Sequence, residues 1–237
     1  MTVNELRLAA RRGENLLITF IIPAGVLLVF SAFDLTGGTA SGKPVDRMLP
    51  GSMALAVIAS AMVSLAIATG FERSYGVLKR LGGSPAGTSA LVASKTAGVI
   101  VIEIVQIALL VAIAAAIGWA AGPAASLLLT VVALALGTVA FAGFGLLMAG
   151  TLRAEATLAL ANLLFLVSLV IGGVIMPLDK LPSTVAAASA LLPPAALTKA
   201  LAIGLGGVAG DATESVVVLA AWAVLVAGLA ARKFRWD

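Results

Sequence analysis

The chain has 237 residues, of which 61% are hydrophobic and 11% are charged, with a formal net charge of +4. Because an ordinary soluble domain has about a quarter of charged residues, this composition excludes a water-soluble fold and predicts an integral membrane protein. The sequence has no histidine and no cysteine, which excludes HExxH zinc proteases, Ser-His intramembrane proteases, histidine proton relays and thiol chemistry.

The first 15 residues mix apolar and charged side chains in a pattern typical of a short helix lying in the membrane interface. This segment is too polar and too acidic for a signal peptide, so we expect the first apolar stretch to be retained as a transmembrane helix.

Six apolar stretches follow and predict six transmembrane helices in one all-α membrane domain that covers residues 1–237. They cover residues 16–33, 53–70, 96–120, 124–150, 156–176 and 215–231. A helix of 18 residues is about 27 Å long, close to the hydrocarbon thickness of about 30 Å.

The distribution of lysine and arginine predicts the orientation. With a cytoplasmic N-terminus, 11 basic residues fall in cytoplasmic segments and 4 in external segments. Since basic residues concentrate on the cytoplasmic side, both termini are expected there, in a bacterial inner membrane. The positive net charge is therefore interpreted as topology and anionic-lipid contact, and no nucleic-acid partner is expected.

Two connections between the predicted spans carry further information. Residues 71–90 form the longest cytoplasmic connection and contain an amphipathic stretch. Residues 177–214 form the longest external connection, yet they are too apolar for a solvated loop. The prolines at 177, 182 and 193 rule out one continuous helix, so this segment is predicted to be an external re-entrant region shielded by neighbouring helices.

Three stretches in this order resemble the permease subunits of type-2 ABC exporters, the family of drug-resistance and polysaccharide-export permeases. The first is LLITFIIPAGVLLVF, with Pro23 inside the first span. The second is FERSYGVLKRLGGSP at 71–85, which is similar to the cytoplasmic coupling helix of that family. The third is GGVIMPLDKLPSTVAAASALLPPAALTKAL at 172–201, which resembles its external re-entrant segment.

The resemblance implies which residues contact a separate ATPase. The candidate coupling residues are Glu72, Arg73, Gly76, Val77, Leu78, Lys79, Arg80 and Leu81. Ser74 and Tyr75 stand where family members often carry a second acidic residue. From the residues alone, the same amphipathic stretch has two interpretations: it rests on lipid headgroups, or it docks on a soluble partner.

Inside the predicted spans, Glu103 is the one clear ionisable residue, and Gln106 lies one helical turn away on the same face. A carboxyl group at that depth normally faces protein or a wet cavity. It is interpreted as a protonated or hydrogen-bonded tie between helices, with a cation or substrate contact as the alternative. Asn162 is interpreted as packing contact between helices rather than as a ligand.

The predicted function is that of a transport subunit without catalytic or metal-binding residues. The chain contains no Walker A motif, so ATP and Mg²⁺ are expected on two separate ABC ATPase subunits. The resemblance implies export and a second permease copy or a related permease, with the substrate path between them. The alternative is an ion- or proton-coupled secondary transporter that uses Glu103, a class that usually shows internal repeats and several buried charges.

Overall fold

The computed structural model describes residues 13–33, 43–77, 87–173 and 182–234. Most of the predicted interfacial helix lies outside these residues, as do Leu78, Lys79, Arg80 and Leu81 of the predicted coupling segment.

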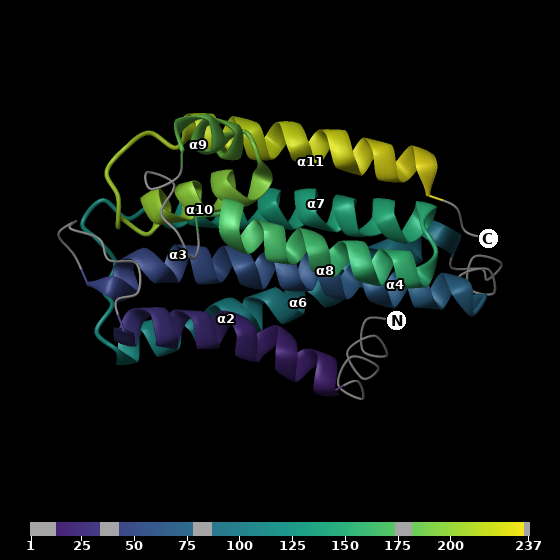
Figure 1. Cartoon of the computed structure of the whole chain (residues 1–237), viewed down its shortest axis with the longest axis horizontal. Coiled ribbons are helices and arrows are strands. Elements are labelled where there is room, and N and C mark those ends of the chain that lie inside the picture. Colours follow the sequence, from purple (N-terminus) through teal and green to yellow (C-terminus); the bar gives the residue numbers. More distant parts are fainter. Residues whose placement is uncertain (1–12, 34–42, 78–86, 174–181, 235–237) are drawn as a thin grey trace.

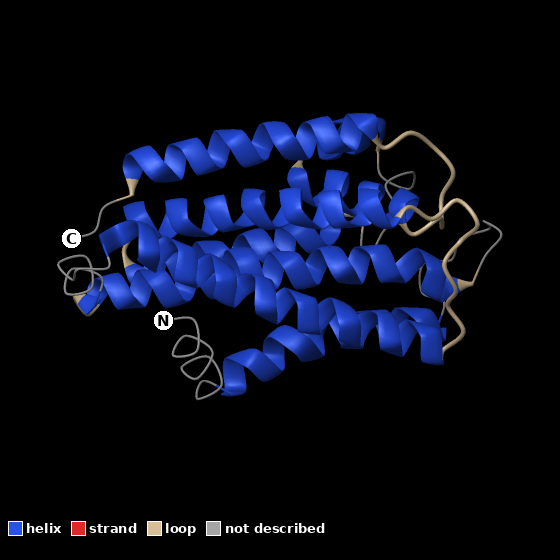
Figure 2. Cartoon of the chain, turned by 180° about the vertical axis from the view of Figure 1, so that it is seen from behind, coloured by secondary structure: helices blue, strands red, loops and turns tan. Residues whose placement is uncertain are grey.

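Helices account for nearly all of the described residues, and these residues contain no strand (Figure 2). In chain order they are α2 (Gly13–Phe33), α3 (Pro44–Val57), η1 (Ile58–Ser64), α4 (Leu65–Ser74), α6 (Gly87–Ala116), α7 (Leu127–Thr151), α8 (Ala154–Ile171), α9 (Ser183–Ala190), α10 (Pro193–Gly204) and α11 (Thr213–Lys233). The segment η1 has π-helical hydrogen bonding and joins α3 to α4 in one long helix.

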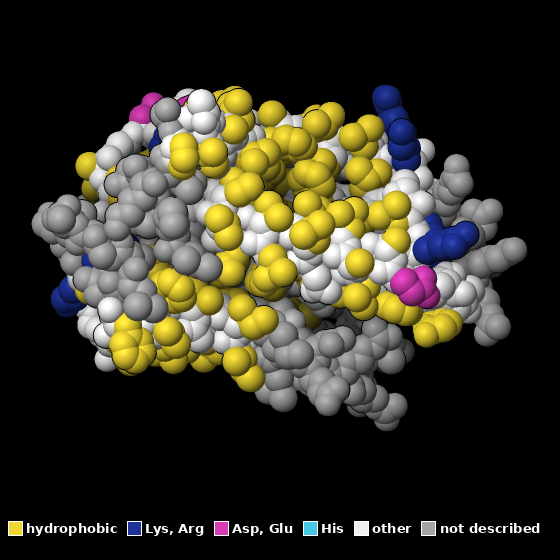
Figure 3. All heavy atoms as spheres, viewed as in Figure 1, with side chains coloured by type: hydrophobic (Ala, Val, Ile, Leu, Met, Phe, Trp, Pro, Cys, Tyr) yellow, Lys and Arg dark blue, Asp and Glu magenta, His cyan; other side chains and the backbone are white. Residues whose placement is uncertain are grey.

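Five helices are long and apolar enough to cross a membrane. They are Pro44–Ser74, Ser94–Ala116, α7, α8 and α11, and a bent pair formed by α9 and α10 would make a sixth if it crossed as one span. The described apolar part of α2 is shorter, Thr19–Phe33. Hydrophobic side chains cover the middle of the molecule, and charged side chains lie toward its two ends (Figure 3). The prediction of an all-α polytopic membrane protein is confirmed.

The second predicted span extends beyond its apolar sequence at both ends. It was expected over residues 53–70, whereas the helix runs from Pro44 to Ser74. Proline suits the first turn of a helix, and Asp46 accepts a hydrogen bond from the backbone N–H of Lys43 at 3.1 Å. The charged residues of both end turns therefore belong to the helix rather than to the loops.

The long helix α3–η1–α4 is the centre of the bundle. It packs against α2, α6, α7, α8 and α10, while α11 packs on the outer side of α7. Figure 1 shows α11 and α2 at opposite edges of the molecule. A Cβ atom at Gly145 of α7 would lie 2.9 Å from the carbonyl oxygen of Met62, so only glycine allows the two backbones to approach so closely.

The helices alternate in direction between two ends of the bundle. The last turn of α4, the α7–α8 turn and the last turn of α11 lie at one end, and the first described turn of α2 lies on that side of the molecule (Figure 1). The α6–α7 and α10–α11 loops lie at the other end, where the N–H of Gly122 donates to Leu205 at 3.1 Å and the N–H of Ser126 donates to Gly204 at 2.8 Å. These bonds join the two loops into one layer.

Helices α9 and α10 meet at an angle of 77°. Helix α10 runs along α7, with Leu197 against Gly137 and Gly204 against Thr130. The indole N–H of Trp222 donates to the carbonyl oxygen of Leu191 at 2.9 Å. Since Trp222 lies nine residues into α11, about 13 Å from its start, the bend lies near the middle of the length of α11, and α10 returns from this level to the loop layer.

Candidate functional site

The last turns of α4 connect to two other helices through their charged side chains. Glu72 forms an ion pair with Lys95 of α6, and the two side chains are only 17% and 6% exposed. Arg73 donates from Nη2 to the carbonyl oxygen of Leu152, in the α7–α8 turn, at 2.5 Å. This end of α4 is therefore fixed to the start of α6 and to the α7–α8 turn.

Helix α4 ends at Ser74, and Gly76 two residues later has a positive φ of 68°, a conformation that glycine adopts without steric cost. The N–H of Gly76 donates to the carbonyl oxygen of Arg73 at 2.9 Å. No described atom lies within 4 Å of the position that a Cβ at Gly76 would take. Among the described residues, the backbone turn and not close packing thus accounts for this glycine.

Two large side chains are exposed directly after the last turn of α4. Tyr75 is 72% exposed and Val77 is 37% exposed. The sequence prediction placed Glu72 and Arg73 on a separate surface helix, but the structure places both in α4 with partners in the same chain. Lys95 was not among the predicted site residues, because nothing in its local sequence identifies a partner 23 positions earlier.

Glu103 lies in α6 and is 6% exposed. Its carboxyl oxygens accept hydrogen bonds from Ser60 of η1 at 3.0 Å and from Thr138 of α7 at 2.6 Å. No cationic side chain in the described part of the chain is within ion-pair distance of this carboxyl group. The site joins three helices through two hydroxyl groups. Neither hydroxyl was identified from the sequence, although each is a polar residue inside an apolar span.

Gln106, one turn further along α6, faces a different helix. Its Nε2 donates to the backbone carbonyl of Thr19 in α2 at 3.0 Å, and the side chain is 2% exposed. The buried Oε1 atom has no hydrogen-bond partner among the described residues. Glu103 and Gln106 therefore connect α6 to α2, η1 and α7, and the structure brings neither of them to the coupling segment.

Asn162 lies on the exposed side of α8. Its Nδ2 donates to the carbonyl oxygen of Leu158, one turn earlier in the same helix, at 3.0 Å. The sequence interpretation expected a contact between helices. Because the carbonyl four residues earlier is always within reach in a helix, the amide is satisfied locally instead.

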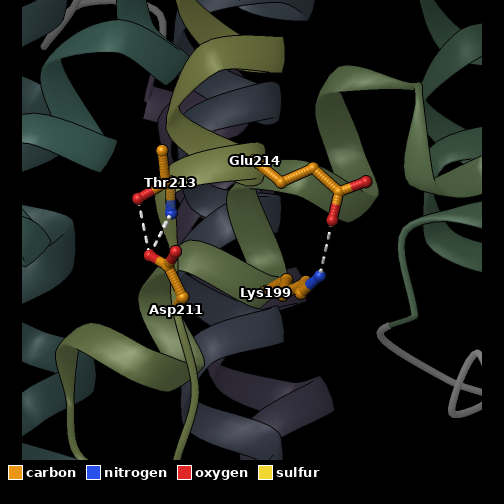
Figure 4. A network of polar contacts seen from close by, with 4 residues as sticks. All are labelled: Lys199, Asp211, Thr213 and Glu214. Atoms are coloured by element: carbon orange, nitrogen blue, oxygen red, sulfur yellow. Dashed lines mark hydrogen bonds and ion pairs between the residues drawn. The ribbon is translucent and has the colours of Figure 1, made fainter.

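A polar network lies at the loop-layer end, where α10 connects to α11 (Figure 4). Lys199 pairs with Glu214 at 3.2 Å, and Asp211 accepts hydrogen bonds from the hydroxyl and the backbone N–H of Thr213 at 2.6 and 2.8 Å. The side-chain hydrogen bond, followed by the backbone one, lowers the pKa of Asp211. All these groups are exposed, so the network stabilises the start of α11 only weakly.

The fold and these sites define a helical multi-pass membrane protein whose polar interior contacts connect helices to one another. The chain matches the family described as ABC-2 type transporter over residues 1–205, and it belongs to that family of membrane transport subunits. A comparison with curated proteins found no match.

Proposed function

We propose that this chain is the membrane-spanning subunit of an ATP-driven exporter and that it forms the substrate path together with a second permease subunit. The family match over residues 1–205 is the observation that carries this proposal. Two separate ABC ATPases would bind ATP and Mg²⁺, because the chain has no Walker A motif of its own.

The ATPase contact is proposed at the segment from Glu72 to Leu81, between α4 and α6. This proposal is supported by the contacts that fix the start of the segment to other parts of the bundle. The ion pair of Glu72 with Lys95 joins the end of α4 to α6, and Arg73 joins it to the α7–α8 turn. A force applied to this segment would thus reach three helices at once, as coupling to ATP hydrolysis requires.

The apolar side chains of the segment would enter a groove of the partner, a mode of recognition common to amphipathic helices. Tyr75 and Val77 are already exposed at the end of α4, and Leu78 and Leu81 follow in the sequence. Lys79 and Arg80 would set the orientation at the rim of the contact.

The orientation follows from the basic residues. The bundle end that carries the ends of α4 and α11 would be cytoplasmic in a bacterial inner membrane. The loop layer would then be external, and the bent α9–α10 pair would enter from that side. The course of α10 from the level of Trp222 back to the loop layer supports this re-entrant assignment.

The coupling proposal is tested by co-purification of the ATPase with two variants of neighbouring residues. Leu78→Asp places a charge in the proposed groove, where a buried apolar anchor contributes about 1.5–3 kcal/mol. We expect this variant to lose most of the bound ATPase and of the stimulated ATP hydrolysis. Lys79→Ala is the matched control and should change mainly the salt dependence. If a correctly inserted Leu78→Asp protein retained both the bound ATPase and the stimulated ATP hydrolysis in full, the coupling role would be refuted.

No observation in the described part of the structure favours the ion-coupled alternative. Among the described residues, the polar partners of the Glu103 carboxyl group are the hydroxyl groups of Ser60 and Thr138, each on a neighbouring helix.

A further inference from the structure

A cavity of about 130 Å³ lies between η1, α7, α8 and the start of α10. Its wall consists of side chains that are apolar except for one hydroxyl. The lining residues are Met62, Phe141, Phe144, Leu164, Val167, Ser168, Ile171, Leu192, Pro193 and Pro194. None of the polar contacts described above reaches this cavity, so its chemistry is separate from the Glu103 site.

The described lining of the cavity has too few polar groups to hold a water molecule. The hydroxyl of Ser168 donates to the carbonyl oxygen of Leu164 in its own helix at 2.7 Å and has no free proton to offer. A buried water needs two to four polar partners, whereas an apolar cavity of about 150 Å³ stays dry and binds benzene. The volume found here therefore fits an apolar group of about six carbon atoms.

The cavity opens at the surface of α8. Val167 is 40% exposed although it lines the cavity, while Met62 and Phe141 at the back are each only 2% exposed. Leu163 and Leu166, near Val167 on α8, are also exposed, so the mouth lies in an apolar surface. A ligand would reach the cavity from a hydrocarbon environment and not from water.

The bend between α9 and α10 forms the remaining wall. Trp222 donates to the carbonyl oxygen of Leu191 and also contacts the ring of Phe144, with ring centroids 5.5 Å apart. A Cβ atom at Gly172 would lie 3.2 Å from Pro194, so the end of α8 packs closely on the start of α10. The cavity wall is thus held in place from two sides.

We propose that this cavity binds an alkyl chain of a membrane amphiphile, which enters from the bilayer past Val167. An alkyl chain that is already surrounded by lipid gains no hydrophobic free energy by moving into the protein. It does gain dispersion contacts with wall atoms that otherwise face a void. This inference extends the proposed function by naming a ligand with an apolar tail. The further step, that the bound alkyl chain belongs to a transported molecule, rests on the proposed function.

The test uses the full-length chain with any co-purifying ATPase, in vesicles of phosphatidylethanolamine and phosphatidylglycerol. The probe is a phosphatidylethanolamine with a diazirine near the end of one acyl chain. After illumination, mass spectrometry locates the adducts. We expect adducts on Met62 and Phe141, which bulk lipid cannot reach because they are almost completely buried.

Two variants move the labelling in opposite directions, so that misfolding cannot produce the whole pattern. Val167→Phe fills the mouth and should lower the adducts on Phe141 about tenfold, which equals 1.4 kcal/mol of binding free energy. Leu164→Ala enlarges the cavity and should raise them. Val170→Phe is the matched control, because Val170 is also exposed on α8, at 50% against 40% for Val167, but does not line the cavity.

Adding ATP to the complex distinguishes whether the bound alkyl chain belongs to a transported molecule or to a resident bilayer lipid. Loss of the Phe141 adducts during turnover would identify a transported molecule, and unchanged adducts would identify a resident bilayer lipid. Adducts confined to exposed side chains, or equal labelling of Phe141 in the parent and in Val167→Phe, would overturn the proposal. Neither result depends on whether Leu78→Asp releases the ATPase, so the two proposals fail independently.

Discussion

Glu103 is an acidic residue inside an apolar bundle, and its surroundings explain how it is tolerated. Two hydroxyl groups from separate helices reach its two oxygens, and each hydroxyl also lies close to a carbonyl of its own helix. Such an arrangement satisfies a buried polar group without a cation. The side chain therefore acts as a connection between α6, η1 and α7.

If Glu103 is a structural connection, its shape and hydrogen-bonding capacity matter more than its charge. Glu103→Gln should fold and transport nearly as well as the parent. Glu103→Leu should lose about 1–3 kcal/mol, because two hydrogen bonds between helices disappear, each worth about 0.5–1.5 kcal/mol. Thermal unfolding in detergent and a transport assay measure both effects. A Glu103→Gln protein that is stable but inactive would show that the charge has a mechanistic role.

Asp211 gives a prediction about pH at the start of α11. Its pKa is lowered by the hydrogen bonds from Thr213, so the ionised form stabilises the folded state above the unfolded pKa of about 3.9. This contribution is lost as the pH falls through the lowered pKa. Asp211→Asn should unfold at a slightly lower temperature than the parent at pH 7, and the difference should vanish in acid. A difference that persists unchanged below pH 3 would contradict this.

At the level of helices, the ion pair between α4 and α6 is the contact most open to a quantitative test. Breaking a buried ion pair by removing one partner costs about 3–5 kcal/mol, and the partial exposure of Glu72 places the expected value near the lower limit. Glu72→Gln and Lys95→Met should each destabilise the protein by about this amount. The double variant should be more stable than the sum of the two losses implies.

A double-variant cycle of thermal unfolding measures this coupling. Lys199→Met with Glu214→Gln is the exposed control pair, for which the coupling should be about 0.2–1 kcal/mol. Equal coupling energies for the two pairs would mean that the Glu72–Lys95 contact does not fix α4 to α6.

Hydropathy predicted where the apolar helices lie along the chain, because membrane spans must be both long and apolar. Five described helices have the length of a span, whereas the first predicted span corresponds to the shorter apolar helix Thr19–Phe33. Hydropathy misplaced the borders of the second span, since Asp46 and Glu72 are charged and yet helical. Asp46 accepts a hydrogen bond from a backbone N–H in its own first turn, and Glu72 pairs with Lys95 of another helix, a contact that forms only when the two helices pack. For the same reason, Ser60 and Thr138 were recognisable only as polar residues, and not as partners of Glu103.

For the whole molecule, the proposed orientation can be tested with single cysteines, because the natural sequence has none. Cysteines at Ser41 and Ser183 should react in intact cells with a thiol reagent that does not cross the membrane. A cysteine at Ser84 should react only after the cells are opened. Reaction at Ser84 in intact cells would reverse the orientation and with it the proposed ATPase contact.

The central claim is that this membrane subunit works with a separate ATPase. The most direct measurement is affinity purification of the chain in mild detergent, followed by mass spectrometry and an assay of ATP hydrolysis. The account predicts a co-purifying protein with a Walker A motif, in an amount comparable to the permease, and measurable hydrolysis. A folded, membrane-derived preparation that contains this chain without any ATPase would contradict it.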